Sequence, residues 1–342
     1  MAGDRTVLVT GGSGFLGGWC VAELLRRGHS VRTTVRDPSR EGEVRSRVQN
    51  LADGSPGAGS DSRLSFVAAD LLHDSGWEQA VDGCEHVLHV ASPFPLAQPK
   101  DPDELIVPAR DGTLRVLRAA LKAGASRVVV TSSVAAVGGS SKGSGRPLDE
   151  SDWTDLDDPS VSPYARSKTI AERAAWDLAG EMGETARLAT VNPGAILGPV
   201  SGPDRSPSLE VVQRLLNGMP GTPRIGFNLV DARDVADLQI RAMGDPAGGK
   251  RLVAVRSFEW MADIAKVLRD QLGEEAPKVP KRSVPDLMVR AMGLFDPTIR
   301  SVVGQLGREQ EYSSAAAEAL GWAPRPIEET IVDCARSMLR EG

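Results

Sequence analysis

Tyr164 and Lys168 are the two side chains whose types and spacing best suit catalysis. On a helix, residues four apart lie on one face, so the phenol and the ammonium share one side. Because a nearby cation favours the phenolate, Lys168 is expected to lower the pKa of Tyr164. Such a phenol can donate a proton to a carbonyl oxygen or accept one from an alcohol. The alternative is a core tyrosine with a surface lysine one turn later.

The triplet Thr131-Ser132-Ser133 supplies hydroxyl groups upstream of this pair. It ends an apolar run, and open α/β sheets bind ligands at the carboxyl ends of their strands. The hydroxyl of Ser133 can hold a substrate carbonyl and stabilise charge that develops on its oxygen. Such a triplet is most often a strand-end turn, but its place before Tyr164 favours a catalytic role.

A glycine-rich loop, T-G-G-S-G-F-L-G, occupies residues 10–17 between an apolar run and a helical pattern. Gly11 permits a tight turn, Gly14 lets backbone approach a pyrophosphate, and Gly17 lets the helix pack close to the strand. The helix N-terminus then presents free N–H groups to the anion. The loop predicts a dinucleotide site, and it is no Walker loop because no Gly-Lys-Ser/Thr follows.

The end of the second apolar run predicts which dinucleotide is bound. NAD enzymes place an acid there on the ribose 2′-hydroxyl, but this chain has Val35 followed by Arg36. A guanidinium matches a 2′-phosphate, so NADP is predicted, with a solvated surface arginine as the alternative. Asp70, after the third run, either accepts from the adenine amine or caps a helix that starts at Leu71.

The elements that position these residues alternate along the chain. Short apolar, β-branched runs predict strands buried on both faces at 6–10, 31–35, 64–68, 86–90, 127–131, 187–191 and 252–255. Helical patterns at 15–27, 113–123 and 164–178 lie between them. This alternation predicts an α/β fold, a Rossmann-type doubly wound parallel sheet.

The pattern weakens after residue 194, where prolines become frequent. We therefore expect a dinucleotide-binding domain at 1–193, completed by about 226–256. A smaller, irregular substrate region is expected at 194–225 and 257–342.

Composition limits the partners of the 342-residue chain. A net charge of −6 argues against nucleic acid and anionic membranes as partners. No apolar stretch is long enough for a signal peptide or a membrane span. The cysteines Cys20, Cys84 and Cys334 are too far apart for a disulfide framework or a metal site, which predicts a cytoplasmic protein without metal.

Together these motifs resemble the extended branch of the short-chain dehydrogenases/reductases. The resemblance includes the glycine loop, the hydroxyl triplet, Y-x-x-x-K at 164–168 and N-P-G-A-I-L-G-P at 192–199. Within that branch, T-V-R-D-P at 34–38, A-S-P-F at 91–94 and D-A-R-D-V-A at 231–236 are similar to dihydroflavonol, cinnamoyl-CoA and aldehyde reductases. The chain departs from the plant enzymes at 159–163, which lacks an Asn-Trp-Tyr-Cys motif, and at Gly138, where flavonoid enzymes carry an amide.

The resemblance implies roles for individual residues. Ser133, Tyr164 and Lys168 would be catalytic, with Tyr164 as general acid and Lys168 also binding ribose. The implied cofactor contacts are Thr10, Gly11, Gly14, Phe15, Leu16, Gly17, Arg36, Asp70, Leu71, Ala91, Ser92, Thr131, Lys168, Pro193, Ala195 and Ile196. The expected substrate contacts are Phe94, Ser133, Val161, Tyr164, Leu197 and Phe227, although Phe94 is also compatible with the core.

The predicted function is NADPH-dependent reduction of a hydrophobic aldehyde or ketone by a monomer or homodimer. Two alternatives stay open: a nucleotide-sugar epimerase or dehydratase with retained NAD, and a non-catalytic NADP-sensing protein. Retained NAD would favour an acid at the position of Val35-Arg36, which argues against the epimerase or dehydratase. A non-catalytic sensor would be expected to have lost Tyr164 and Lys168, and both are present.

Overall fold

The computed structural model describes residues 6–52, 62–92, 101–139, 145–202, 206–296, 300 and 302–341. The chain divides into two compact units. The first comprises Met1–Pro193, Arg233–Ala254 and Ser313–Ala323, and the second comprises Gly194–Ala232, Val255–Tyr312 and Pro324–Gly342. The predicted segment 226–256 is therefore split, because the strand at Gly226–Asp231 pairs inside the second unit.

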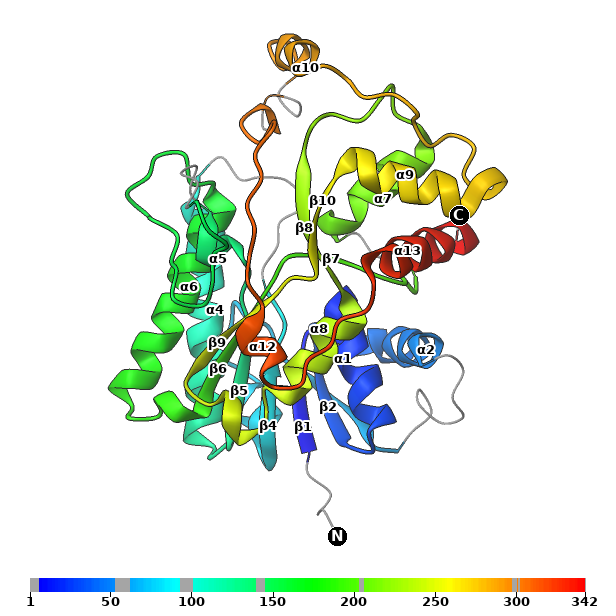
Figure 1. Cartoon of the computed structure of the whole chain (residues 1–342). Helices are drawn as coiled ribbons and strands as arrows, with labels where there is room; N and C mark the ends of the chain where they lie inside the picture. The colour runs from blue at the N-terminus through cyan, green and yellow to red at the C-terminus, as the bar shows by residue number, and fades with distance from the viewer. Residues whose placement is uncertain are drawn as a thin grey trace. The chain divides into compact units, whose positions relative to one another are not determined.

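The first unit is built on a seven-stranded sheet in the order β3-β2-β1-β4-β5-β6-β9 (Figure 1). Every neighbouring pair is parallel. The strands are β1 (Thr6–Thr10), β2 (Ser30–Val35), β3 (Leu64–Ala68), β4 (Cys84–His89), β5 (Arg127–Thr131), β6 (Leu188–Pro193) and β9 (Lys250–Ala254). The predicted Rossmann-type sheet is confirmed. Its order reverses between β1 and β4, which is where such sheets bind ligands.

Helices connect these strands, with α1 packed against α2 and α4 along α6 (Figure 1). They are α1 (Phe15–Arg26), α2 (Glu41–Leu51), α3 (Trp77–Val81), α4 (Asp103–Lys122), α5 (Ala135–Gly138), α6 (Pro163–Glu181), α8 (Ala232–Arg241) and α12 (Ala315–Glu318). Short 3-10 turns occupy η1 (Pro38–Arg40), η2 (Thr185–Arg187) and η4 (Asp245–Ala247).

Helix α4 begins at Asp103, although the sequence pattern predicts a start at Thr113. Pro108 and Gly112 obscure the pattern because both residue types disfavour helix interiors. Leu105, Ala109 and Gly112 nevertheless lie on the buried face of the helix. Tertiary packing therefore extends the helix beyond the part that propensity predicts.

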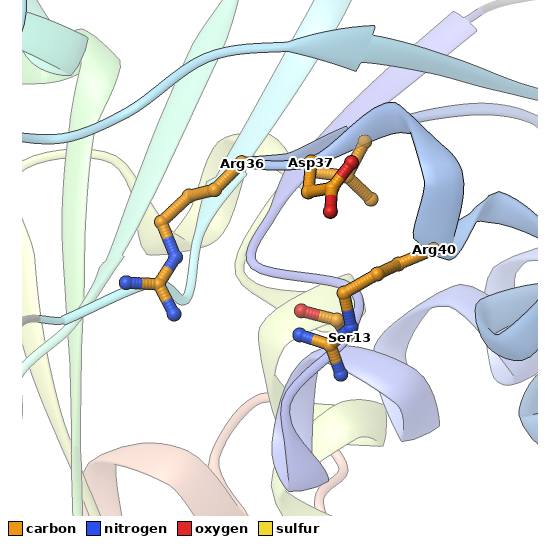
Figure 2. A pocket seen from close by; sticks show the side chains of 5 residues that line it. Ser13, Arg36, Asp37 and Arg40 are labelled. Carbon is orange, nitrogen blue, oxygen red and sulfur yellow. The ribbon is translucent and has the colours of Figure 1, made fainter.

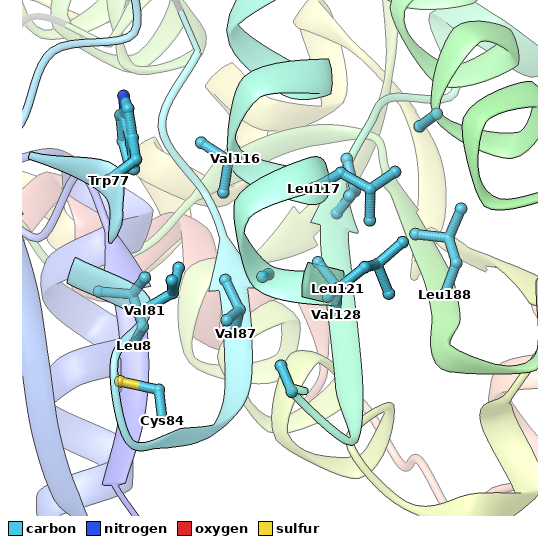
Figure 3. Packing of buried hydrophobic residues seen from close by; sticks show 14 of the residues in the cluster. Leu8, Trp77, Val81, Cys84, Val87, Val116, Leu117, Leu121, Val128 and Leu188 are labelled. Atoms are coloured by element: carbon cyan, nitrogen blue, oxygen red, sulfur yellow. The ribbon is translucent and has the colours of Figure 1, made fainter. Parts of the chain in front are cut away.

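The core of the first unit joins β1, β4, β5 and β6 to α3, α4 and α6 (Figure 3). Leu117 and Leu121 of α4 point toward Val128 of β5 and Leu188 of β6 in Figure 3, and all four are at most 4% exposed. Burial of each such side chain contributes about 1.5–3 kcal/mol. This packing fixes the strand ends that carry the candidate site.

The second unit contains a three-stranded sheet in the order β10-β8-β7. Its strands are β7 (Ala195–Leu197), β8 (Gly226–Asp231) and β10 (Ser257–Trp260). Its helices are η3 (Pro207–Leu209), α7 (Glu210–Asn217), α9 (Met261–Leu272), η5 (Gly273–Glu275), α10 (Asp286–Met292) and α13 (Ile327–Glu341). Helix α13 packs against α7 and α9. Within the described ranges, no helix combines the length and the apolar character that crossing a bilayer demands.

Candidate active site

The glycine loop connects β1 to α1 through a tight turn in which Gly14 and Gly17 lie against the backbone of Gly11. Gly11 has a φ of +74°, which favours glycine, and its carbonyl accepts a hydrogen bond of 2.9 Å from the N–H of Gly14. A Cβ on Gly17 would overlap the carbonyl of Gly11, so a side chain there would push the helix off the turn. Gly14 caps α1 with no side-chain acceptor, which leaves first-turn N–H groups for an anion.

Two threonines of β2 hold this loop. Thr34 Oγ1 accepts from the N–H of Gly11 at 3.1 Å, and Thr33 Oγ1 accepts from the N–H of Gly12 at 3.1 Å. The Thr33 hydroxyl in turn donates to the carbonyl of Val9 at 2.8 Å. Backbone groups of the loop thus have fixed partners on β2, which preorganises the phosphate cradle. Sequence reasoning missed these threonines, and two adjacent hydroxyl residues in an otherwise apolar strand were the available signal.

A hollow, here called the β2 hollow, lies at the end of β2 (Figure 2). Its cavity of about 290 Å³ is lined by Ser13, Val35, Arg36, Asp37 and Arg40. Ser13 belongs to the glycine loop, whereas Val35 is the last residue of β2 and the other three lining residues follow it. The guanidinium groups of Arg36 and Arg40 extend in the same direction in Figure 2. A cavity with two cations beside the pyrophosphate loop has the chemistry for a ribose 2′-phosphate.

Asp37 and Arg40 each have a local hydrogen-bond partner that limits their part in binding a phosphate. Asp37 Oδ1 accepts from the N–H of Ser39 at 2.9 Å and so caps η1. Hydrogen bonds from Ser39 hold the pKa of Asp37 below its usual range. Arg40 donates two hydrogen bonds of 2.9 Å to Glu43, so Arg36 carries the less compensated charge. Sequence analysis missed Arg40, which the Pro38 turn brings back beside Arg36.

Asp70 sits in a turn after β3. Its Oδ1 accepts from the N–H of Leu72 at 3.0 Å, and its carbonyl accepts from the indole N–H of Trp77 at 3.1 Å. The next helix in the chain is α3, which begins at Trp77 behind the N-cap Gly76. The alternative reading, a helix cap at Leu71, does not hold, because no helix starts there and the carboxylate closes a turn instead. Contact of Asp70 and Leu71 with adenine stays a prediction.

Thr10 ties the glycine loop to the end of β4. Its Oγ1 accepts from the N–H groups of Val90 and Ala91 at 3.1 and 3.0 Å and lies 2.9 Å from Nδ1 of His89. With both lone pairs occupied, the hydroxyl proton must point to Nδ1, which requires neutral His89 with its proton on Nε2. Burial, together with the charge of Lys168, lowers the pKa of His89 to about 3.

Tyr164 and Lys168 lie in the first turns of α6. The helix starts at Pro163, and the hydroxyl of Ser162 caps it by accepting from the N–H of Ala165 at 3.2 Å. Lys168 Nζ lies 6.0 Å from the centre of the Tyr164 ring and donates to Ser92 Oγ, after β4, at 3.2 Å. The phenol and the ammonium thus share one side of α6, and both are partly exposed.

Ser133 follows the end of β5 and is buried. Its Oγ accepts from the N–H of Ala135 at 3.1 Å, so its hydroxyl proton can serve as a donor. Thr131 differs, because its Oγ1 accepts from Gln239 of α8 at 2.7 Å. Pro193, at the end of β6, accepts from the N–H of Val134 at 3.0 Å. The first unit therefore brings the β4, β5 and β6 ends together beside α6.

The remaining predicted contacts stay predictions. Ala195, Ile196, Leu197 and Phe227 belong to the second unit, on β7 and β8. Phe94 lies outside the described residues, and Val161 is buried just before α6. Among the residues that the structure describes, no three His, Cys, Asp or Glu side chains are grouped to hold a metal ion.

Comparison with known proteins decides the family. The model of the NAD dependent epimerase/dehydratase family matches residues 7–254. The chain belongs to this family. It is 34% identical to a cinnamoyl-CoA reductase of Medicago truncatula, over 85% of this chain and 90% of the relative. It is 36% identical to a dihydroflavonol 4-reductase of Zea mays, over 81% of this chain and 76% of the relative.

A solved structure agrees with these relatives. Gre2 of Candida albicans, in complex with NADPH, superposes with a TM-score of 0.79 at 25% identity, over 98% of this chain and 99% of that one. The predicted membership of the extended short-chain dehydrogenases/reductases, close to their dihydroflavonol and cinnamoyl-CoA reductases, is confirmed.

Proposed function

We propose that this protein reduces the carbonyl group of a hydrophobic aldehyde or ketone, aromatic ones included, with NADPH. The observation that carries the proposal is the shared side of Tyr164 and Lys168 on α6, in the same unit as the glycine loop. A phenol beside an ammonium serves proton transfer to oxygen, which carbonyl reduction requires. The reductase names of the two curated relatives support the same reaction class.

The glycine loop and the β2 hollow fit the cofactor. The absence of a side chain at Gly17 lets α1 start directly against the turn at Gly11. The N-terminus of α1 has no side-chain cap, so its N–H groups can donate to a pyrophosphate. Arg36 and Arg40 line a cavity large enough for the 2′-phosphate. The NADPH bound to Gre2 supports this choice. When bound, NADPH supplies the hydride.

The chain's own residues handle the oxygen and the proton. Ser133 donates a hydrogen bond to the substrate carbonyl and holds it against the end of β5. Tyr164 donates the proton to the oxygen as the alcohol forms. Lys168, anchored to Ser92 at 3.2 Å, stabilises the phenolate that remains and binds the nicotinamide ribose.

The test is NADPH oxidation across a panel of hydrophobic aldehydes and ketones. Tyr164→Phe removes only the proton donor, so kcat should fall by at least about 100-fold with NADPH binding and Tm preserved. Tyr312→Phe, at the only other tyrosine, is the matched control and should keep wild-type kcat. Turnover that survives in Tyr164→Phe would refute the assigned mechanism.

A further inference from the structure

Glu172 is a buried carboxylate that the proposed reaction does not use. It lies on α6 one turn beyond Lys168, and its side chain is fully buried. Burying an ionised carboxylate is costly unless charge and hydrogen bonds compensate it. The hydrogen-bond partners of Glu172 therefore indicate what this buried charge on α6 does.

The carboxylate of Glu172 connects α6 to three adjacent strands of the sheet. One oxygen, Oε2, accepts from Ser132 Oγ at 2.5 Å and from Asn192 Nδ2 at 2.7 Å. The other, Oε1, accepts from Thr190 Oγ1 at 2.9 Å and Arg251 Nε at 2.7 Å. These donors lie at the end of β5, on β6 and on β9, so a single side chain holds the helix to all three strands.

Asn192 extends this connection to the candidate catalytic serine. Its amide nitrogen carries two protons, and besides Glu172 it contacts the carbonyl oxygen of Ser133 at 3.2 Å. Ser132, the other residue bound to Oε2, immediately precedes Ser133 in the chain. The carboxylate thus contacts both the residue before Ser133 and the amide that holds the Ser133 backbone.

Arg251 supplies the compensating charge and is itself fixed. Its Nη1 donates to the carbonyls of Glu150 and Asp152 at 2.8 and 2.6 Å, and its guanidinium carbon lies 3.6 Å from the centre of the Trp153 ring. Because Arg251 is fixed in this way, the Glu172 carboxylate has little freedom to move relative to the sheet. The ion pair therefore gives the carboxylate a fixed place in the first unit.

We propose that Glu172 is a positioning residue that sets Ser133 against Tyr164 and Lys168. The inference rests on the proposed function, because it assigns those three residues to the reaction. Its acceptor oxygens, rather than its charge, carry the role, since they hold the β5 and β6 ends to the helix that bears the phenol. Displacement of a catalytic group by about 1 Å can lower the rate about 100-fold.

Two double variants separate the acceptor role from the ion pair. Glu172→Leu with Arg251→Met and Glu172→Gln with Arg251→Met both remove the two charges, which is often tolerated in buried pairs. Only the glutamine retains an oxygen that can accept from Ser132 and Asn192. We expect kcat to fall about 100-fold in the leucine variant and to be largely retained in the glutamine variant, with the Kd for NADPH unchanged in both.

A single substitution tests the same idea if the leucine variant fails to fold. Ser132→Ala removes one hydrogen bond to Glu172 and leaves the ion pair with Arg251 in place. It should lower kcat about tenfold, with the Kd for NADPH unchanged. Thr169→Val is the matched control, because Thr169 is also buried on α6 but donates to Ala165 of its own helix at 2.7 Å. Its kcat should stay at the wild-type value even if Tm falls.

Equal kcat in the two double variants, or equal kcat losses in Ser132→Ala and Thr169→Val, would overturn the inference and leave Glu172 a structural ion pair. Failure of the proposed function is seen elsewhere, as a Tyr164→Phe variant that still turns over.

Discussion

Replacing Arg36 with alanine removes the cation whose charge is least compensated in the β2 hollow. Arg40 is shared with Glu43 through two bonds of 2.9 Å, whereas Arg36 lines the same cavity of about 290 Å³ from the strand end. A charge-assisted hydrogen bond contributes about 1.5–3 kcal/mol. The Kd for NADPH should therefore rise about 10- to 100-fold, while the Kd for NADH, which lacks the 2′-phosphate, should hardly change.

The assay is a fluorescence titration of each variant with NADPH and with NADH at low and at moderate salt. Because Arg36 is exposed, screening should shrink the difference between wild type and Arg36→Ala as salt is added. Arg40→Ala should show a smaller selective loss than Arg36→Ala, because Glu43 already offsets its charge.

Arg26→Ala is the control for the loss of any surface cation. Arg26 is the last residue of α1 and pairs with Glu23, at the end of the helix far from the glycine loop. A helix of this length places it about 18 Å away, beyond the screening distance of about 10 Å at 0.1 M salt. Equal losses for NADPH and NADH in Arg36→Ala, or the same selective loss in Arg26→Ala, would refute the assignment of the 2′-phosphate site.

Three further predictions concern the framework of the site. Gly17→Ala should abolish measurable cofactor binding and lower Tm, because its Cβ meets the backbone of Gly11, which cannot yield as a flexible side chain can; unchanged binding in a titration would contradict the tight loop. His89 has its pKa lowered from 6.5 to about 3, so the unfolded chain binds the extra proton and stability falls as pH drops below 6.5, by about 2 kcal/mol at pH 5. Urea unfolding at pH 5 and pH 8 should show this difference in wild type and a smaller one in His89→Gln. Leu117→Ala should cost about 2–5 kcal/mol in urea unfolding through the cavity it leaves, and a loss below 1 kcal/mol would contradict the packing in Figure 3.

Local sequence patterns determined most of what could be predicted. The glycine loop, the strands of the first unit and the spacing of Tyr164 and Lys168 depend on residues a few positions apart, so backbone geometry alone places them. Helix α4 was predicted only in part, since Pro108 and Gly112 mask a face that packing buries. For Asp70, the sequence offered an adenine contact or a helix cap, and the turn that its carboxylate closes was not foreseen, because the same side chain can serve either local role.

Only the tertiary structure decided the contacts between residues that are far apart in the chain. Arg36 and Arg40 line one cavity with Ser13 of the glycine loop, more than 20 positions earlier in the chain, because β2 pairs with β1. Thr33 and Thr34 serve the loop because β2 pairs with β1 in parallel. Glu172 meets Arg251 across 79 positions because β9 joins the sheet beside β6. No spacing in the sequence encodes such partners, because strand order brings them together and hydrophobic packing of the sheet holds them there.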